Sequence, residues 1–122
     1  MNSDQVQQWL ALYVDAWRAN EPELIADLFT PDATYYADPF DEGLHGRQAI
    51  VDEWLGVEMP RRFETAYRPV LVDGNRAFAT GYTRYFNEDG SSHGEWGNAF
   101  LLTFDANGKC HEYREWFMKR RL

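Results

Sequence analysis

The stretch that decides the fold runs from residue 28 to residue 55 and reads LFTPDATYYADPFDEGLHGRQAIVDEWL. Its pattern is typical of the end of a helix, a short strand, an Asp-Pro turn, a Gly-rich loop and a new helix. This order places Asp38 and the rings of Tyr35, Tyr36 and Phe40 at a strand end that faces a loop. We therefore expect a small closed pocket with a carboxylate at its edge.

Three helices are predicted in the first half of the chain. Apolar residues at helical spacing predict one amphipathic helix over residues 4–19, with Ser3 as its N-cap. A second helix is expected to begin at Pro22 and to bury a stripe within residues 24–29. A third is expected to begin near Arg47.

The pattern changes to a period of two in the second half of the chain, which predicts strands. The predicted strands are 61–72, 76–87, 92–104 and 109–118. Turn sequences such as Asp73-Gly74-Asn75 join them into an antiparallel meander. Helices first and strands afterwards indicate an α+β fold, in which a curved antiparallel sheet wraps around three N-terminal helices and leaves a hollow. The length and the lack of a linker predict one domain over residues 1–122.

Charge and cysteine content narrow the classes of protein. The formal charge of −8 disfavours binding to nucleic acid or to an anionic membrane surface. The single cysteine, Cys110, excludes an internal disulfide, and no apolar run approaches the length of a spanning helix, so a cytoplasmic protein is expected. Aromatic residues make up 16% of the chain, so some rings are expected to line a cavity or a subunit interface, the alternative being bulky core.

The segments LFTPDATYYADPF (28–40) and GLHGRQAIVDEW (43–54), in this architecture, resemble the nuclear transport factor two-like superfamily, especially its SnoaL-like members. The resemblance covers nearly the whole chain and implies a cone-shaped, cystatin-like roll. The superfamily contains isomerases, cyclases, dehydratases, epoxide hydrolases and pure binding domains, so it does not imply one activity. Its members commonly pair through the outer face of the sheet, which implies a homodimer.

The sequence LYVDAW at 12–17, followed by LF, DAT and DP, also resembles ketosteroid isomerase. That family uses a tyrosine of the first helix as oxyanion donor and an aspartate before proline as base, roles that fall on Tyr13 and Asp38. Its second oxyanion donor is an acid, which falls at about Phe100, with Asn98 two residues away. The acid is missing here, which argues against a steroid isomerase.

Each candidate for chemistry has a structural alternative. Asp38 in an apolar hollow would have a raised pKa and act as a general base, or it caps the Asp-Pro turn. Tyr13 would stabilise an oxyanion, or it is a core tyrosine. In the strand 92–104 the even positions are bulkier, so Asn98 is expected to face inward.

The isomerase register places Tyr113, Glu115 and Phe117 inside the hollow. Glu115 would then be a second pocket carboxylate, able to raise the pKa of Asp38. The alternative for Glu115 is a solvated pair with Arg84 or another basic residue on a neighbouring strand.

His45 would orient a carboxylate or gate the pocket mouth, or it is simply exposed. The histidines at 45, 93 and 111 lack close ligand spacing, and no phosphate loop or nucleophile motif is present, so neither metal nor cofactor is expected. The side chains expected to contact a ligand are Trp17, Tyr35, Phe40, His45, Trp54, Tyr82, Trp96, Phe100, Tyr113 and Phe117.

Three functions remain open from the sequence. The first is a cofactor-free acid–base enzyme, of isomerase, cyclase or dehydratase type, that acts on a small apolar carbonyl or polyketide-like molecule. The second is a non-catalytic module that binds a hydrophobic or aromatic ligand. The third is a dimerisation module whose hollow has no function.

Overall fold

The computed structural model describes residues 1–57 and 62–121. Within these residues the chain forms three helices and one six-stranded sheet of strand order β2-β1-β6-β5-β4-β3. The elements are α1 Ser3–Ala19, α2 Pro22–Ala26, β1 Phe29–Tyr36, β2 Leu44–His45, α3 Arg47–Gly56, β3 Arg62–Asp73, β4 Arg76–Phe86, β5 Ser92–Phe104 and β6 Cys110–Lys119. The predicted α+β class is confirmed.

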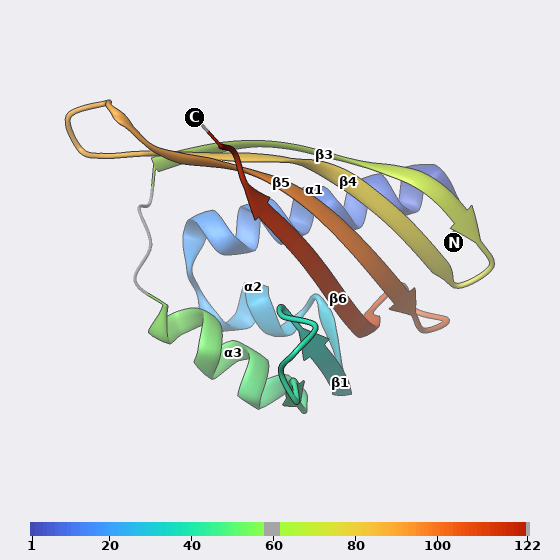
Figure 1. The fold of residues 1–122 in the computed structure, drawn as a ribbon. Coiled ribbons are helices and arrows are strands. Elements are labelled where there is room, and N and C mark those ends of the chain that lie inside the picture. Colours follow the sequence, from blue (N-terminus) through green and yellow to red (C-terminus); the bar gives the residue numbers. More distant parts are fainter. Residues whose placement is uncertain (58–61, 122) are drawn as a thin grey trace.

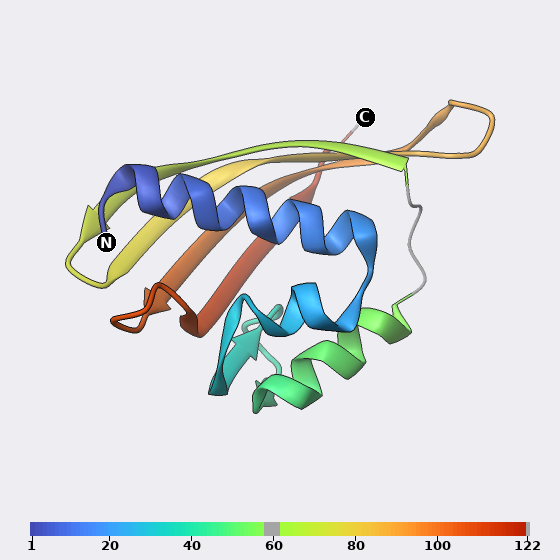
Figure 2. The same ribbon diagram turned by 180° about the vertical axis from the view of Figure 1, so that it is seen from behind.

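The four long strands β3 to β6 form a curved antiparallel sheet that arches over the helices (Figure 1). The reverse view shows α1 lying along one face of this sheet, with α2 and α3 gathered below it (Figure 2). The strands follow each other through tight turns, in which Gly74 and Gly108 adopt the positive φ values of 62° and 78° that glycine tolerates best. The predicted meander is therefore present.

The start of α1 differs from the prediction by one residue. Asn2, not Ser3, is the N-cap: its side chain accepts a hydrogen bond from the Gln5 backbone N–H, and the Gln5 side chain accepts one from the Asn2 backbone N–H. This reciprocal pair satisfies two donors that a helix start otherwise leaves free.

The second helix is shorter than its apolar pattern predicts. It ends at Ala26, Leu24 is 43% exposed, and Phe29 already belongs to β1, where it pairs with Cys110 of β6. Strand pairing with a distant part of the chain overrides the local helical preference here. The predicted start of the first long strand, residue 61, lies outside the described residues.

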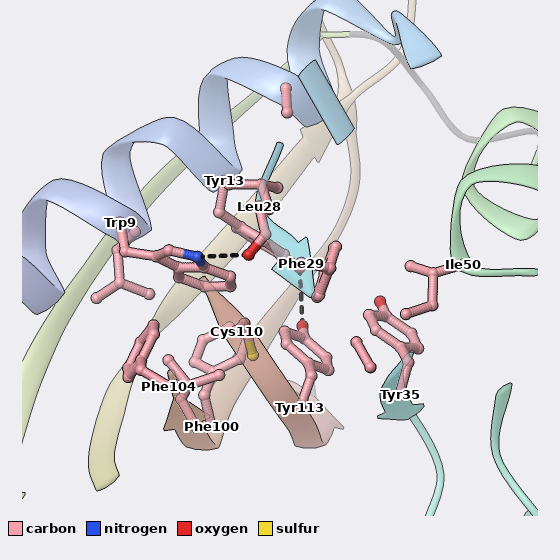
Figure 3. Packing of buried hydrophobic residues seen from close by; sticks show 14 of the residues in the cluster. Trp9, Tyr13, Leu28, Phe29, Tyr35, Ile50, Phe100, Phe104, Cys110 and Tyr113 are labelled. Atoms are coloured by element: carbon pink, nitrogen blue, oxygen red, sulfur yellow. Dashed lines mark hydrogen bonds between the residues drawn. The ribbon is translucent and has the colours of Figure 1, made fainter. Parts of the chain in front are cut away.

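Aromatic side chains dominate the core (Figure 3). The indole N–H of Trp9 donates to the carbonyl of Leu28 at 3.1 Å, so its burial leaves no unpaired donor. The rings of Tyr35 and Tyr113 stack with their centroids 4.2 Å apart. This packing joins α1 and β1 to the concave face of the sheet and frames the space described below.

Candidate functional site

A cavity of about 400 Å³ lies between the helices and the concave face of the sheet, within the size range of small-molecule sites. Two helices and four strands contribute side chains to its wall. The lining residues are Tyr13 and Trp17 of α1, Tyr35 of β1, Ala37, Trp54 of α3, Val57, Thr83 and Tyr85 of β4, Trp96 and Asn98 of β5, and Glu115 and Phe117 of β6. Seven of these twelve residues are aromatic.

Two periodicities place these side chains together. Tyr13 and Trp17 are four residues apart and share one face of α1. Strand alternation turns Trp96 and Asn98 to the same side of β5, and Asn98 pairs directly with Phe117 of β6. The expected inward face of this strand is the one that lines the cavity.

Glu115 is the carboxylic acid in the cavity wall. Its Oε1 accepts a hydrogen bond from the Tyr113 hydroxyl at 2.6 Å, and its Oε2 accepts one from Asn98 Nδ2 at 2.8 Å. Burial raises the pKa of Glu115, although both hydrogen bonds act to lower it. Across residues 1–57 and 62–121, Glu115 takes part in no ion pair, so no cation offsets the effect of burial.

Hydrogen bonds extend from Glu115 in two directions. On one side the Tyr113 hydroxyl lies 2.9 Å from that of Tyr13, the contact drawn as a dashed line in Figure 3. On the other side Asn98 Oδ1 accepts from the Thr83 hydroxyl at 2.8 Å, and that hydroxyl also contacts the hydroxyl of Tyr67. The acid is therefore the junction of a tyrosine arm and an amide arm.

Asp38 does not lie in this cavity, so its expected position is wrong. It is exposed, and its Oδ1 accepts a hydrogen bond from the Phe40 backbone N–H at 2.9 Å. The turn-capping alternative holds because a short aspartate side chain reaches the backbone two residues ahead. Asp38 borders a separate depression together with Trp116 and Met118.

Three of the expected ligand contacts lie outside the cavity. Phe40 is 96% exposed in the same turn, and His45 is exposed with Nε2 3.1 Å from the Glu42 carbonyl oxygen. Tyr82 lies on the outer face of β4, under the guanidinium of Arg84. Alternation along β4 explains this position, since Thr83, the next residue, points inward.

Two others lie behind the cavity wall. Phe100 and Tyr113 are completely buried and belong to the core. Tyr113 still acts on the site through its hydrogen bond to Glu115. Of the remaining sequence candidates, the structure brings these together in the wall: Tyr13, Trp17, Tyr35, Trp54, Trp96, Asn98, Glu115 and Phe117.

Thr83 and Tyr85 line the cavity but were not among the sequence candidates. The turn at residues 87–91 sets the register of β4 and β5, in which Thr83 pairs with Trp96. Residues directly opposite in an antiparallel pair share a face, so the inward position of Trp96 implies that of Thr83. The hairpin register was therefore the sequence signal that could have identified Thr83 as a cavity residue.

In residues 1–57 and 62–121, His, Cys, Asp and Glu side chains nowhere gather in a group of three that could hold a metal ion. In the same residues no helix has the length and apolar character needed to cross a membrane.

A family model of SnoaL-like domains matches residues 10–113, and the chain belongs to this family, part of the nuclear transport factor 2-like superfamily. A comparison with curated protein sequences finds no match.

Solved structures share the fold at low sequence identity. An NTF-2-like protein of unknown function from Burkholderia xenovorans has a TM-score of 0.73 and 17% identity, over 98% of this chain and 87% of that one. A candidate SnoaL-like polyketide cyclase from Jannaschia sp. has 0.75 and 13%, over 94% and 86%. A candidate ketosteroid isomerase from Kribbella flavida has 0.71 and 16%, over 98% and 82%. These likenesses show the fold alone.

Proposed function

We propose that the cavity is the active site of a cofactor-independent acid–base enzyme that acts on a small, mostly apolar carbonyl or polyketide-like molecule. One observation carries the proposal: Glu115 presents a carboxylic acid with a raised pKa in the wall of an aromatic cavity. A general base works best when its pKa lies near the working pH, and burial moves a carboxylic acid in that direction.

In the proposed reaction the ionised Glu115 removes a proton from a carbon next to the substrate carbonyl. The C–H bond breaks, its electron pair forms the enolate, and the proton forms a new O–H bond on Glu115. In a substrate with a conjugated double bond, returning that proton to the far carbon of the dienolate gives an isomerase. Attack of the enolate carbon on a second carbonyl forms a C–C bond and an alkoxide, which takes the proton back from Glu115, and this gives a cyclase. The amide of Asn98 stabilises the charge that develops on the enolate oxygen, as a fixed donor in a dry site does.

The aromatic side chains of the wall provide a binding surface for the substrate and exclude water from the carboxylate. Trp17, Trp54 and Trp96 offer large rigid surfaces for an apolar substrate frame. They also limit water around the carboxylate, which keeps its proton affinity high. Val57 and Phe117, which are 40% and 55% exposed, place the cavity rim at the ends of α3 and β6.

Hydrogen–deuterium exchange tests this function without knowledge of the substrate. A panel of enolisable ketones, such as 2-tetralone, is incubated with the protein in D2O, and deuterium at the carbon next to the carbonyl is followed by mass spectrometry. We expect exchange above the buffer rate in the wild type and a loss of about 100-fold or more in Glu115→Gln, since that variant cannot accept the proton.

Asp38→Asn is the matched control, because it alters a carboxylate that lies outside the cavity. We expect it to exchange like the wild type. Equal exchange in Glu115→Gln and the wild type contradicts the proposal, and loss of exchange in Asp38→Asn alone would return the base role to Asp38.

A second function, non-catalytic binding of a hydrophobic or aromatic ligand, is favoured by the same apolar wall and by the hydrogen bonds that already occupy both oxygens of Glu115. A ligand at 100 times its Kd raises the free energy of unfolding by about 2.7 kcal/mol. Thermal stabilisation by such ligands, with no exchange for any ketone, selects this function over the enzyme.

We also propose a homodimer and a cytoplasmic location. The outer sheet face exposes Trp116 and Met118 by 42% and 72%, and large exposed apolar groups of this kind favour a protein interface. The one cysteine, Cys110, is buried with its thiol free, as suits a reducing compartment.

A further inference from the structure

The chemistry of Glu115 determines where the hydrogens of its neighbours lie. An ionised carboxylate can only accept hydrogen bonds. The Tyr113 hydroxyl 2.6 Å from Oε1 must therefore donate to it, and the Asn98 amide must turn its NH2 group, not its oxygen, toward Oε2.

The hydrogens of the amide arm follow outward in the same way. With its nitrogen toward Glu115, Asn98 directs Oδ1 to the Thr83 hydroxyl, which donates to it at 2.8 Å. Because the hydrogen of Thr83 is used in this bond, its oxygen accepts from the hydroxyl of Tyr67. Thr83 is 1% exposed, so bulk water cannot replace the bond that it donates.

We propose that Thr83, oriented by Tyr67, is a positioning residue that fixes the Asn98 amide with its NH2 group toward Glu115 and the cavity, so that the cavity binds its ligand through a carbonyl oxygen. This inference rests on the proposed function in one respect, namely that the cavity is the ligand site.

The ligand class follows from the second hydrogen of the amide. Asn98 Nδ2 carries two hydrogens, and within the described residues it donates one hydrogen bond, to Glu115. Asn98 itself lines the cavity. The wall therefore offers a hydrogen-bond donor directly beside the carboxylate acceptor, which matches a carbonyl oxygen beside an acidic C–H group.

The two arms differ in whether their hydrogen bonds can reverse direction when Glu115 takes up a proton. In the tyrosine arm every member is a hydroxyl, which can donate or accept, so the hydrogens of Tyr13 and Tyr113 can reverse when Glu115 takes up a proton. An amide nitrogen cannot accept, so the amide arm keeps its direction in both states. Loss of the Thr83 hydroxyl leaves Asn98 Oδ1 without its donor, so the amide is then held on the Glu115 side alone.

The first experiment measures the pKa of Glu115 by 13C NMR of its side-chain carboxyl in three variants. Thr83→Val keeps the side-chain shape and removes the donor to Asn98 Oδ1, so the amide is held less firmly against Glu115 and the pKa of Glu115 rises by about one unit. Thr83→Ser retains the hydroxyl, so the pKa of Glu115 is expected to equal that of the wild type. Thr80→Val, on the opposite face of β4, leaves it unchanged.

The titration reports the hydrogen bond and not another charge. Within residues 1–57 and 62–121, the ionisable side chains that respond to the charge of Glu115 are five tyrosines: Tyr13 of α1, Tyr35 of β1, Tyr67 of β3, Tyr85 of β4 and Tyr113 of β6. Burial raises the pKa of each of these hydroxyls, so all five stay neutral through the range in which a carboxylic acid titrates.

The second experiment compares two ligands of the same shape by calorimetry. They are 2-acetylnaphthalene and 2-isopropenylnaphthalene, in which a CH2 group replaces the carbonyl oxygen. The wild type and Thr83→Ser are expected to bind the ketone about tenfold more tightly, which corresponds to one hydrogen bond. In Thr83→Val the ratio falls toward one.

An unchanged pKa in folded Thr83→Val, an equal rise in Thr80→Val, or equal affinity of the wild type for both ligands overturns the inference. If Thr83→Val does not fold, Tyr67→Phe decides: the freed Thr83 hydroxyl turns, and the pKa of Glu115 rises by a few tenths of a unit, whereas an unchanged pKa overturns the inference. The pKa and affinity measurements do not depend on turnover. If they overturn the role of Thr83, the exchange experiment with Glu115→Gln still tests the enzymatic function independently.

Discussion

Glu115 and Asp38 are both carboxylates, yet their surroundings differ completely. Asp38 satisfies its oxygen within its own turn and remains in solvent. Glu115 stands on a strand whose alternation turns it inward, where two donors hold it without a counter-charge. A buried charge with hydrogen bonds but no cation is tolerated at a cost, and that cost is expressed as a raised pKa.

This cost predicts how stability depends on pH. A carboxylic acid whose pKa is raised by folding stabilises the folded protein below its unfolded value of about 4.3, and this contribution is lost as the pH rises through the folded pKa. Glu115→Gln should match the wild type near pH 4 and exceed its stability at higher pH. The expected gain is about 1.4 kcal/mol for every tenfold increase in proton affinity that folding gives the carboxylate.

The glutamine can be accommodated because the tyrosine arm reverses: its NH2 group donates to Tyr113, while its oxygen still accepts from Asn98. Urea unfolding at several pH values between 4 and 9 provides the measurement. A stability difference that does not change with pH would contradict the prediction.

Among the elements, β4 is the one that orders the site. Its inward side chains Thr83 and Tyr85 line the cavity, and Gly81 precedes them on the same face. A Cβ atom at Gly81 would overlap the carbonyl oxygen of Ala66 and lie 2.6 Å from the ring of Tyr67, so β3 can approach β4 here only because residue 81 has no side chain.

Gly81→Ala should therefore cost about 1–3 kcal/mol of folding free energy, as overpacking does. Gly97→Ala, in the adjacent strand, is the matched control because its Cβ would meet nothing within 4 Å. We expect that control to be neutral or slightly stabilising in chemical denaturation. Equal losses in both variants would show that space at residue 81 is not the cause.

Elements of this kind were largely predictable from the sequence, whereas their ends and their side-chain partners were not. Turn sequences at residues 73–75 and 87–90 locate the hairpins, since the chemistry of a turn is local. The strand start at Phe29 depends on pairing with Cys110, 81 residues later, which no local pattern encodes. The inward direction of Thr83 follows from the hairpin register, but its hydrogen-bond partners depend on β5 and β6 together.

For Asp38 the local structure was predicted correctly, but the direction of the side chain was not. The Asp-Pro turn was recognised correctly, but the turn-capping and catalytic interpretations use the same residue types, and only the direction of the side chain separates them. Asn98 was found because alternation along a strand fixes direction as well as position, whereas the inward direction of Glu115 came from the register that the resemblance to ketosteroid isomerase implies.

At the scale of the whole molecule, the outer sheet face gives a test of the proposed dimer. Trp116→Glu places a charge in the centre of the exposed apolar group and should yield monomers, since an unpaired charge is costly in an interface. Leu12→Glu is the control, because Leu12 is 57% exposed on α1, away from that face.

Light scattering after size-exclusion chromatography measures both variants at micromolar concentration. The wild type and Leu12→Glu should have twice the mass of the chain, and Trp116→Glu the mass of one chain. A wild type that is already monomeric contradicts the dimer.

The position of β6 in the strand order has a consequence for biosynthesis. This strand lies between β1 and β5, although the ribosome makes β1 early and β6 after all the other strands. Strand β1 and the rings that pack on Tyr113 must therefore wait, uncovered on that side, until about residue 119 has left the exit tunnel. We expect nascent chains halted before that point to need chaperone protection and to acquire protease resistance only once β6 is free to insert.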